Sequence, residues 1–163
     1  SHLGTLPVLF RTFPDARVVV THRDPVVAQA SVTNLLGTLY WMRSGKAFDA
    51  GAFESLMTPQ SGAARLDGVI ALIESGAVPR AQIHNFRYVD MIDDPLAALR
   101  TLYHDVGLEL SDAALAGMRD YLSHKPQGKF GKHRYSVGEQ QENARKRAFF
   151  RRYQEYFNCP DET

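Results

Sequence analysis

The sequence predicts an α/β fold in which helices flank a parallel sheet in three layers, and three observations lead to this prediction. Two short runs, Arg17–Thr21 with three consecutive valines and Gln82–Phe86 near further aromatic residues, have the length and composition of strands. Each run precedes an Asp-Pro pair, Asp24-Pro25 or Asp94-Pro95. This pair favours a helix start because aspartate caps helices and proline suits the first helical position. The long, mainly helical segment between the runs is the crossover that parallel neighbours need. We therefore expect the two strands to be adjacent and parallel.

Helices are expected wherever apolar residues recur at helical spacing between caps. The expected segments are residues 1–13, 25–42, 52–57, 63–74, 95–107, 111–123 and 140–157. Residues 43–51 are expected to form a polar turn. Thr58–Gly62 is expected to break the chain and to cap a helix that begins at Ala63. The length of 163 residues indicates one domain.

Composition and charge narrow the classes of function. A net charge of +1 argues against nucleic acid as the main partner. The basic helix expected over Gln140–Phe157 would allow RNA binding, but no recognisable nucleic-acid module accompanies it. The single cysteine, Cys159, has no partner for an internal disulfide and indicates a reducing, cytoplasmic compartment. No apolar run approaches the roughly 20 residues that a membrane span needs, and no signal peptide opens the chain.

Arg23 and Ser31 form the first candidate site. Arg23 stands between the first strand and the helix that follows, where unpaired first-turn N–H groups and the helix dipole attract anions. Ser31 follows eight residues later, and helical side chains lean back toward the N-terminus. One guanidinium and one hydroxyl could then converge on a single phosphate. The alternative is that Arg23 only covers the sheet edge and that Ser31 has no role.

The spacing R-D-P-x-x-x-x-x-S resembles the 3′-phosphate-binding motif of sulfotransferases that use 3′-phosphoadenosine 5′-phosphosulfate (PAPS). In that family the arginine and the serine of the motif hold the 3′-phosphate of the cofactor. The resemblance therefore implies that Arg23 and Ser31 bind PAPS and its product, adenosine 3′,5′-bisphosphate (PAP). It also implies a sulfotransferase fold like that of the P-loop nucleotide hydrolases, of which this chain would form a part.

The first seventeen residues resemble the segment that precedes this motif in bacterial sulfotransferases. His2 matches the histidine of a Lys-x-Pro-x-His-Leu element at the sulfuryl-transfer site, which implies that His2 accepts the proton of the acceptor. The lysine, the proline and the Gly-rich loop for the 5′-phosphosulfate would precede residue 1. We therefore expect the chain to be the C-terminal part of a longer enzyme and to be inactive alone. A terminal histidine without a role is the alternative for His2.

Two later blocks extend the resemblance in the family's order. Phe86–Leu108 resembles the family's strand, Tyr-Glu-Asp-Leu and Asp-Pro helix, and Tyr88 matches the tyrosine beside the adenine. The sequence departs from the family by having Val89-Asp90 in place of Glu-Asp, and a core tyrosine is the alternative. Lys125–Tyr135 resembles the late Gly-Lys-His-Arg-Tyr loop that covers the 3′-phosphate, against the alternative of a solvated basic loop. The cofactor-binding residues implied in this loop are Lys129, Gly131, Lys132, His133 and Arg134.

The resemblance implies transfer of the sulfuryl group of PAPS to a hydroxyl or amine of a small-molecule, carbohydrate or lipid acceptor. No metal is expected, because the six histidines show no ligand spacing. A non-catalytic nucleotide-binding or scaffold domain that keeps the anion pocket remains the alternative. A protein-kinase catalytic loop at His22-Arg23-Asp24 is excluded, since position 29 is Gln29 where that loop requires asparagine.

Overall fold

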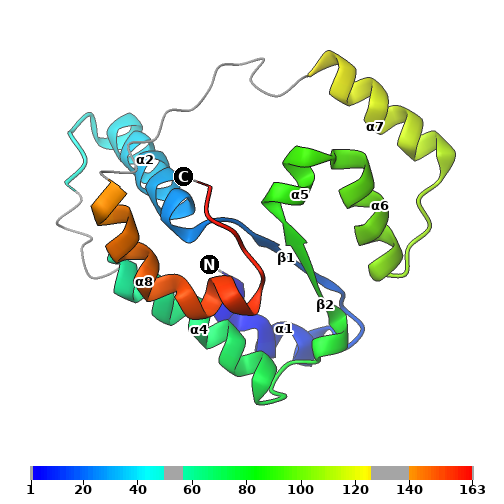
Figure 1. The fold of residues 1–163 in the computed structure, drawn as a ribbon, viewed down its shortest axis with the longest axis horizontal. Coiled ribbons are helices and arrows are strands. Elements are labelled where there is room, and N and C mark those ends of the chain that lie inside the picture. The colour runs from blue at the N-terminus through cyan, green and yellow to red at the C-terminus, as the bar shows by residue number, and fades with distance from the viewer. Residues whose placement is uncertain (1, 50–56, 126–139, 163) are drawn as a thin grey trace. The chain divides into compact units, whose positions relative to one another are not determined.

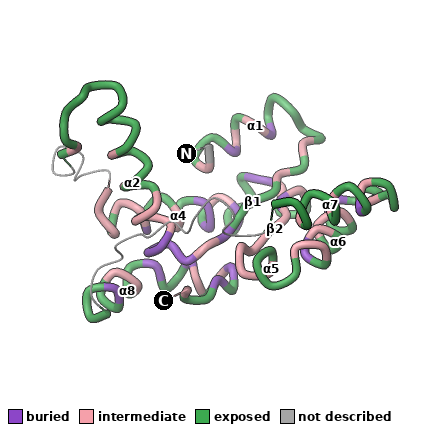
Figure 2. The backbone as a smooth tube through the Cα atoms, turned by 90° about the horizontal axis from the view of Figure 1, so that it is seen from above, coloured by how far each residue is buried: buried purple, intermediate pink, exposed green. Residues whose placement is uncertain are grey.

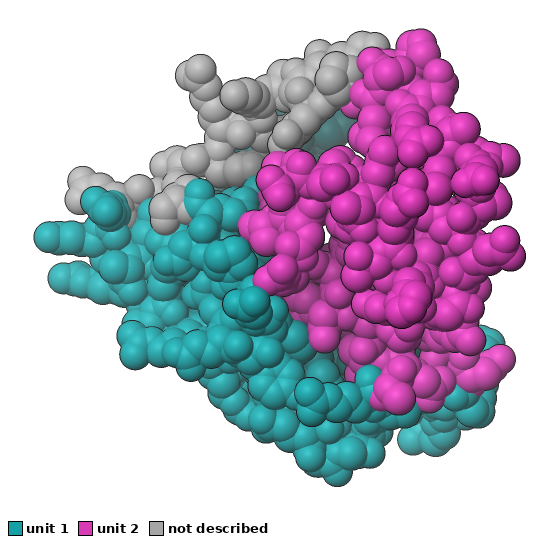
Figure 3. Space-filling model, turned by 45° about the vertical axis from the view of Figure 1, so that its right-hand side comes forward, with its two compact units in different colours: residues 1–14, 23–80, 135–163 teal, residues 15–22, 81–134 magenta. Residues whose placement is uncertain are grey.

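The computed structural model describes residues 2–49, 57–125 and 140–162. The chain divides into two compact units (Figure 3). One comprises residues 1–14, 23–80 and 135–163, and the other comprises residues 15–22 and 81–134. The first is called the helical unit below, and the second is called the sheet unit.

The sheet unit contains the two predicted strands. β1 (Val18–His22) and β2 (Ile83–Arg87) pair in parallel, with Val18 opposite Ile83 and His22 opposite Arg87 (Figure 1). The prediction of adjacent, parallel strands is confirmed, with each strand one residue further along the chain than expected. A short 3₁₀ turn, η3 (Arg80–Gln82), leads into β2. The Gln82 side-chain amide donates to the carbonyl oxygen of Ala16 at 2.8 Å, which ties together the segments that enter the two strands.

Three helices complete the sheet unit: α5 (Tyr88–Asp93), α6 (Pro95–Asp105) and α7 (Asp112–His124). The predicted caps are present, because Asp94 accepts hydrogen bonds from the N–H groups of Leu96 and Ala97 and Ser111 accepts one from Ala114. α5 was not predicted, since its six residues are too few to show a helical period. α5 and α6 both pack against β2.

In the helical unit, α2 (Pro25–Ser44) begins where its sequence indicates and ends two residues later than the expected residue 42. Asp24 caps it by accepting the Val26 N–H at 2.9 Å, and Gly45 ends it with a left-handed φ of 66°. The apolar stripe predicted along this helix is buried only in its first turn, at Val26 and Val27. Further along, Figure 2 shows the helix exposed, and the apolar side chains there include Leu35, Leu39, Trp41 and Met42.

Two helix starts differ from the predictions, both at a proline. α4 (Pro59–Glu74) begins four residues before Ala63, because the expected breaker at Thr58–Gly62 forms its cap and first turn. Thr58 Oγ1 accepts the Ser61 N–H at 3.1 Å, and Pro59 occupies a position where no N–H is needed. At the N-terminus the expected helix over residues 1–13 is a 3₁₀ turn, η1 (His2–Thr5), followed by α1 (Leu6–Thr12) with Pro7 in its first turn.

The core of the helical unit joins three helices. Val26 of α2, Ala63 of α4 and Phe150 of α8 (Gln140–Tyr156) are buried together, with Leu66 packed against them. The Phe150 ring lies against Gly62, where an added Cβ would approach it to 3.3 Å. This packing places α8 and the residues after it beside the start of α2. Among the helices that the structure describes, none has both the length and the apolar composition that a membrane span requires.

Candidate anion-binding site

The predicted junction between strand and helix is present, and Arg23 lies within it. β1 ends at His22, and Asp24 is the N-cap of α2, so Arg23 is the residue immediately before the cap. The N–H groups of the first helical turn have no intrahelical acceptors, and the helix dipole adds positive charge at the same end. The sequence therefore places a guanidinium beside a helix N-terminus, which is a combination that binds anions.

An anion from the chain itself is bound to Arg23. The Glu162 carboxylate accepts hydrogen bonds from Arg23 Nε at 2.8 Å and from Arg23 Nη2 at 2.9 Å. Glu162 Oε1 also accepts the backbone N–H of Asp24 at 3.3 Å. The Arg23 side chain is 29% exposed and that of Glu162 is 16% exposed, so the pair is largely shielded from water. Because these two residues are 139 positions apart, no local pattern in the sequence indicates the contact.

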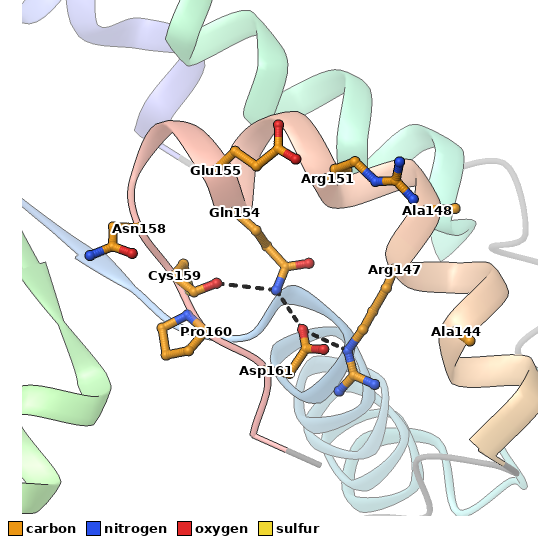
Figure 4. A pocket seen from close by; sticks show the side chains of 10 residues that line it. All are labelled: Ala144, Arg147, Ala148, Arg151, Gln154, Glu155, Asn158, Cys159, Pro160 and Asp161. Carbon is orange, nitrogen blue, oxygen red and sulfur yellow. Dashed lines mark hydrogen bonds and ion pairs between the residues drawn. The ribbon is translucent and has the colours of Figure 1, made fainter.

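Asp24 connects this pair to α8. Its Oδ2 atom accepts from Arg147 Nη2 at 2.7 Å and from the backbone N–H of Glu162 at 3.0 Å, while Oδ1 caps α2. Arg147 also forms an ion pair with Asp161, with Nε 2.9 Å from Oδ1 (Figure 4). The Gln154 side-chain amide donates to the same Asp161 oxygen at 2.8 Å. Polar contacts thus hold the end of the chain against the start of α2.

The buried pair at the centre of this network is ionised. Burial raises the pKa of Asp24, but hydrogen bonds from the Glu162 N–H, Arg147 and the Val26 N–H, together with the charge of Arg147, outweigh burial and leave that pKa below its usual value. Burial lowers the pKa of Arg147, but its hydrogen bond and attraction to Asp24, and its contact with Asp161, raise that pKa overall. Asp24 is therefore a carboxylate at neutral pH, and Arg147 is a cation.

His22 lies in the sheet unit, one residue before Arg23 in the chain. It is 1% exposed, and its Nε2 atom is 2.9 Å from Asn85 Oδ1 on β2. Burial lowers the pKa of His22, and the hydrogen bond to Asn85 opposes this only in part. The ring is therefore neutral at neutral pH, and we assign the proton to Nε2, from which it is donated to Asn85. This bond joins the two strands at the end of β1.

The structure describes some of the other predicted site residues, and others lie outside the described part of the chain. Ser31 is half-buried on α2, in the helical unit with Arg23, and its hydroxyl forms no hydrogen bond with any residue that the structure describes. Tyr88 is half-buried at the start of α5 in the sheet unit, and its contact with an adenine stays a prediction. Lys129, Gly131, Lys132, His133 and Arg134 lie outside the described residues, as does the side chain of His2. Joint binding of a phosphate by Arg23 and Ser31 stays a prediction.

Relatives of this chain include two curated proteins and one solved structure. The chain is 29% identical over 125 residues to omega-hydroxy-beta-dihydromenaquinone-9 sulfotransferase Stf3 of Mycobacterium bovis, and equally to that of Mycobacterium tuberculosis. The match covers 76% of this chain and 31% of each relative. The fold is similar to that of sulfotransferase STF9 from Mycobacterium avium, with a TM-score of 0.71 and 24% identity over 99% of this chain and 41% of that one.

The chain thus spans about a third of the length of the curated relatives that it matches. A model of the sulfotransferase family matches residues 1–112, which are more than half of the chain and include β1, Arg23, all of α2 and β2. The chain belongs to the sulfotransferase family.

Proposed function

We propose that this chain provides the 3′-phosphate-binding part of a PAPS-dependent sulfotransferase, with Arg23 as the main contact and Ser31 as the second. The observation that supports the proposal is the carboxylate bound at Arg23. It is held by two guanidinium N–H groups and one backbone N–H at the start of α2. A phosphate oxygen accepts the same donors in the same geometry, so the residues present fit the group.

The chemistry requires little of the protein beyond binding and positioning. When bound, PAPS supplies the sulfuryl group, whose bond to the phosphate oxygen of the nucleotide breaks as the acceptor oxygen bonds to sulfur. Arg23 and Ser31 would hold the nucleotide by its 3′-phosphate, and the resemblance of residues 129–134 to the family's late loop implies further contacts with the cofactor. His2 would take the proton that the acceptor loses. Positioning of this kind accounts for much of catalysis in such in-line displacements.

We extend the proposal to an acceptor whose hydroxyl is carried by an apolar molecule. The curated relatives are named for an omega-hydroxy menaquinone, an apolar quinone with a hydroxyl. On α2 of this chain lies a groove of about 420 Å³, lined by Leu36, Leu39, Tyr40, Arg43, Ser44 and Phe48. Leu39 is an apolar residue of this lining, so its replacement tests binding in the groove.

Two experiments test these proposals separately. Calorimetric titration should show that the chain binds PAP more tightly than AMP, because AMP lacks the 3′-phosphate. Equal affinity would contradict the phosphate site. Calorimetric titration with a long-chain alcohol should show binding, and Leu39→Ser should weaken it. Absence of binding, or equal binding by the variant, would contradict the apolar acceptor and would leave the phosphate site untouched.

A further inference from the structure

The Glu162 carboxylate occupies the donors that the proposed function assigns to the 3′-phosphate. It accepts from Arg23 Nε and Nη2 at 2.8 and 2.9 Å, and from the Asp24 backbone N–H at 3.3 Å. These three donors are the guanidinium and the main-chain N–H that a phosphate at this junction would use. A carboxylate and a phosphate oxygen cannot accept the same N–H groups at full strength at the same time.

The charge around Arg23 leads to the same conclusion. Among the residues that the structure describes, two arginines, Arg23 and Arg147, face three carboxylates, those of Asp24, Asp161 and Glu162, which gives these five groups a formal charge of 2 − 3 = −1. A phosphate approaching this cluster meets a guanidinium whose charge is already balanced, and a net negative field. If Glu162 leaves, the same arithmetic over the remaining four groups is 2 − 2 = 0. Departure of Glu162 therefore restores an arginine that can pair with the incoming anion.

The segment that carries Glu162 is attached in a way that allows it to leave. Phe157 and Cys159 are buried and anchor the end of α8 in the helical unit. Pro160 and Asp161 are exposed, and Asp161 is held by Arg147 and Gln154 (Figure 4). Glu162 is held by its hydrogen bonds to Arg23 and Asp24. A phosphate that takes the place of the Glu162 carboxylate would keep the donors of Arg23 paired, whereas exposing the buried apolar side chains of Phe157 and Cys159 to water would lose their burial. Residues 160–162 can thus detach while Cys159 and α8 stay packed.

We propose that residues 160–162 are a gate whose Glu162 carboxylate is displaced by the 3′-phosphate of the nucleotide. The gate keeps Arg23 paired and ordered before the nucleotide binds, and it weakens binding by competing for the same donors. This inference rests on the proposed function, because it requires a phosphate at Arg23. It adds an internal competitor to that site.

Titration calorimetry of a charge-neutral variant tests the gate. Glu162→Gln should bind PAP about threefold to tenfold more tightly than the unaltered chain, because the amide competes less well for a guanidinium. AMP affinity should not change, since AMP has no group for Arg23. The matched control is Glu155→Gln, which removes one negative charge from exposed α8 and leaves the Arg23 pair intact. It should leave PAP affinity unchanged.

Each other outcome identifies a specific failure. Weaker PAP binding by Glu162→Gln would show that Glu162 positions Arg23 for the phosphate, and unchanged binding would show that it does not compete; both overturn the gate. An equal gain in Glu155→Gln would show a general charge effect and would also overturn it. If Arg23→Ala binds PAP as tightly as the unaltered chain does, the proposed function itself fails.

Hydrogen exchange provides a second test that needs no variant. The Glu162 N–H donates a hydrogen bond to Asp24 Oδ2 at 3.0 Å. The exchange rate of this amide therefore reports whether residues 160–162 are bound beside Asp24 or detached. Saturating PAP should speed the exchange of this amide, and AMP should not. Slower exchange with PAP, or the same rate with and without it, would contradict displacement of the segment.

Discussion

Asp24 and Arg147 form a buried ion pair, with Oδ2 and Nη2 2.7 Å apart, that joins the cap of α2 to the middle of α8. The Asp24 side chain is fully shielded and that of Arg147 is 15% exposed. This pair determines where the helix that carries Ser31 begins relative to α8. It also fixes the atom to which the Glu162 N–H is bonded.

Removal of Arg147 from this ion pair should destabilise the fold. Arg147→Met should lower the free energy of unfolding by about 3 kcal/mol, because it leaves the Asp24 charge buried without its cation. Urea denaturation measures the loss. The matched control is Arg152→Met, also on α8, whose ion pair with Glu74 is 51% exposed on both sides and should contribute less than about 1 kcal/mol. Equal losses in the two variants would contradict the importance of the buried pair.

Asp24 should make the fold sensitive to acid. Its pKa is below the ordinary 3.8 in the folded chain, so the folded state binds the proton less readily than the unfolded state. The stability that follows is complete above about pH 4 and is lost as pH falls through the lowered pKa. In Asp24→Asn, which keeps a capping oxygen, this part of the pH dependence should be absent. Parallel stability curves for the two proteins below pH 4 would disprove the assignment.

The titration of His22 should affect the stability of the fold at higher pH than the titration of Asp24 does. Because burial lowers its pKa from 6.5, the unfolded chain takes up a proton at a pH where the folded chain does not. Stability should therefore be complete above about pH 6.5 and should decline as pH falls from there toward the lowered pKa. His22→Gln removes this titration and keeps an amide that can reach Asn85. If the variant loses as much stability between pH 7 and pH 5 as the unaltered chain does, His22 is not the group responsible.

Features of the site that depend on neighbouring residues could be predicted from the sequence. The Asp24-Pro25 start of α2 is set by contacts within one turn, which local residue order determines. The parallel pairing of β1 and β2 followed from their composition and from the helical segment between them. Thr58–Gly62 was misread because a proline after a cap can either end a segment or open a helix, and here it opens α4.

Contacts between distant residues could not be predicted in this way. Glu162 contacts Arg23, which is 139 positions away in the sequence, and Arg147 contacts Asp24, which is 123 positions away. Both contacts depend on the packing of α8 against α2 and α4 around Phe150, which no period in the sequence specifies. The sequence indicated an anion site at Arg23, and the structure adds the carboxylate that is bound there.

The central claim is that Arg23 binds a 3′-phosphate, and calorimetric titration of Arg23→Ala with PAP and AMP tests it most directly. Hydrogen bonds to charged groups contribute roughly 1.5–3 kcal/mol each, so the variant should bind PAP about tenfold or more weakly. Ser31→Ala should lose less, because a neutral hydroxyl donates a single bond. Arg152→Ala, at an exposed arginine of α8 that pairs with Glu74, is the matched control and should bind both nucleotides normally. The account predicts that Arg23→Ala loses affinity for PAP while its AMP affinity is unchanged. Equal losses for both nucleotides, or no loss for either, would contradict it.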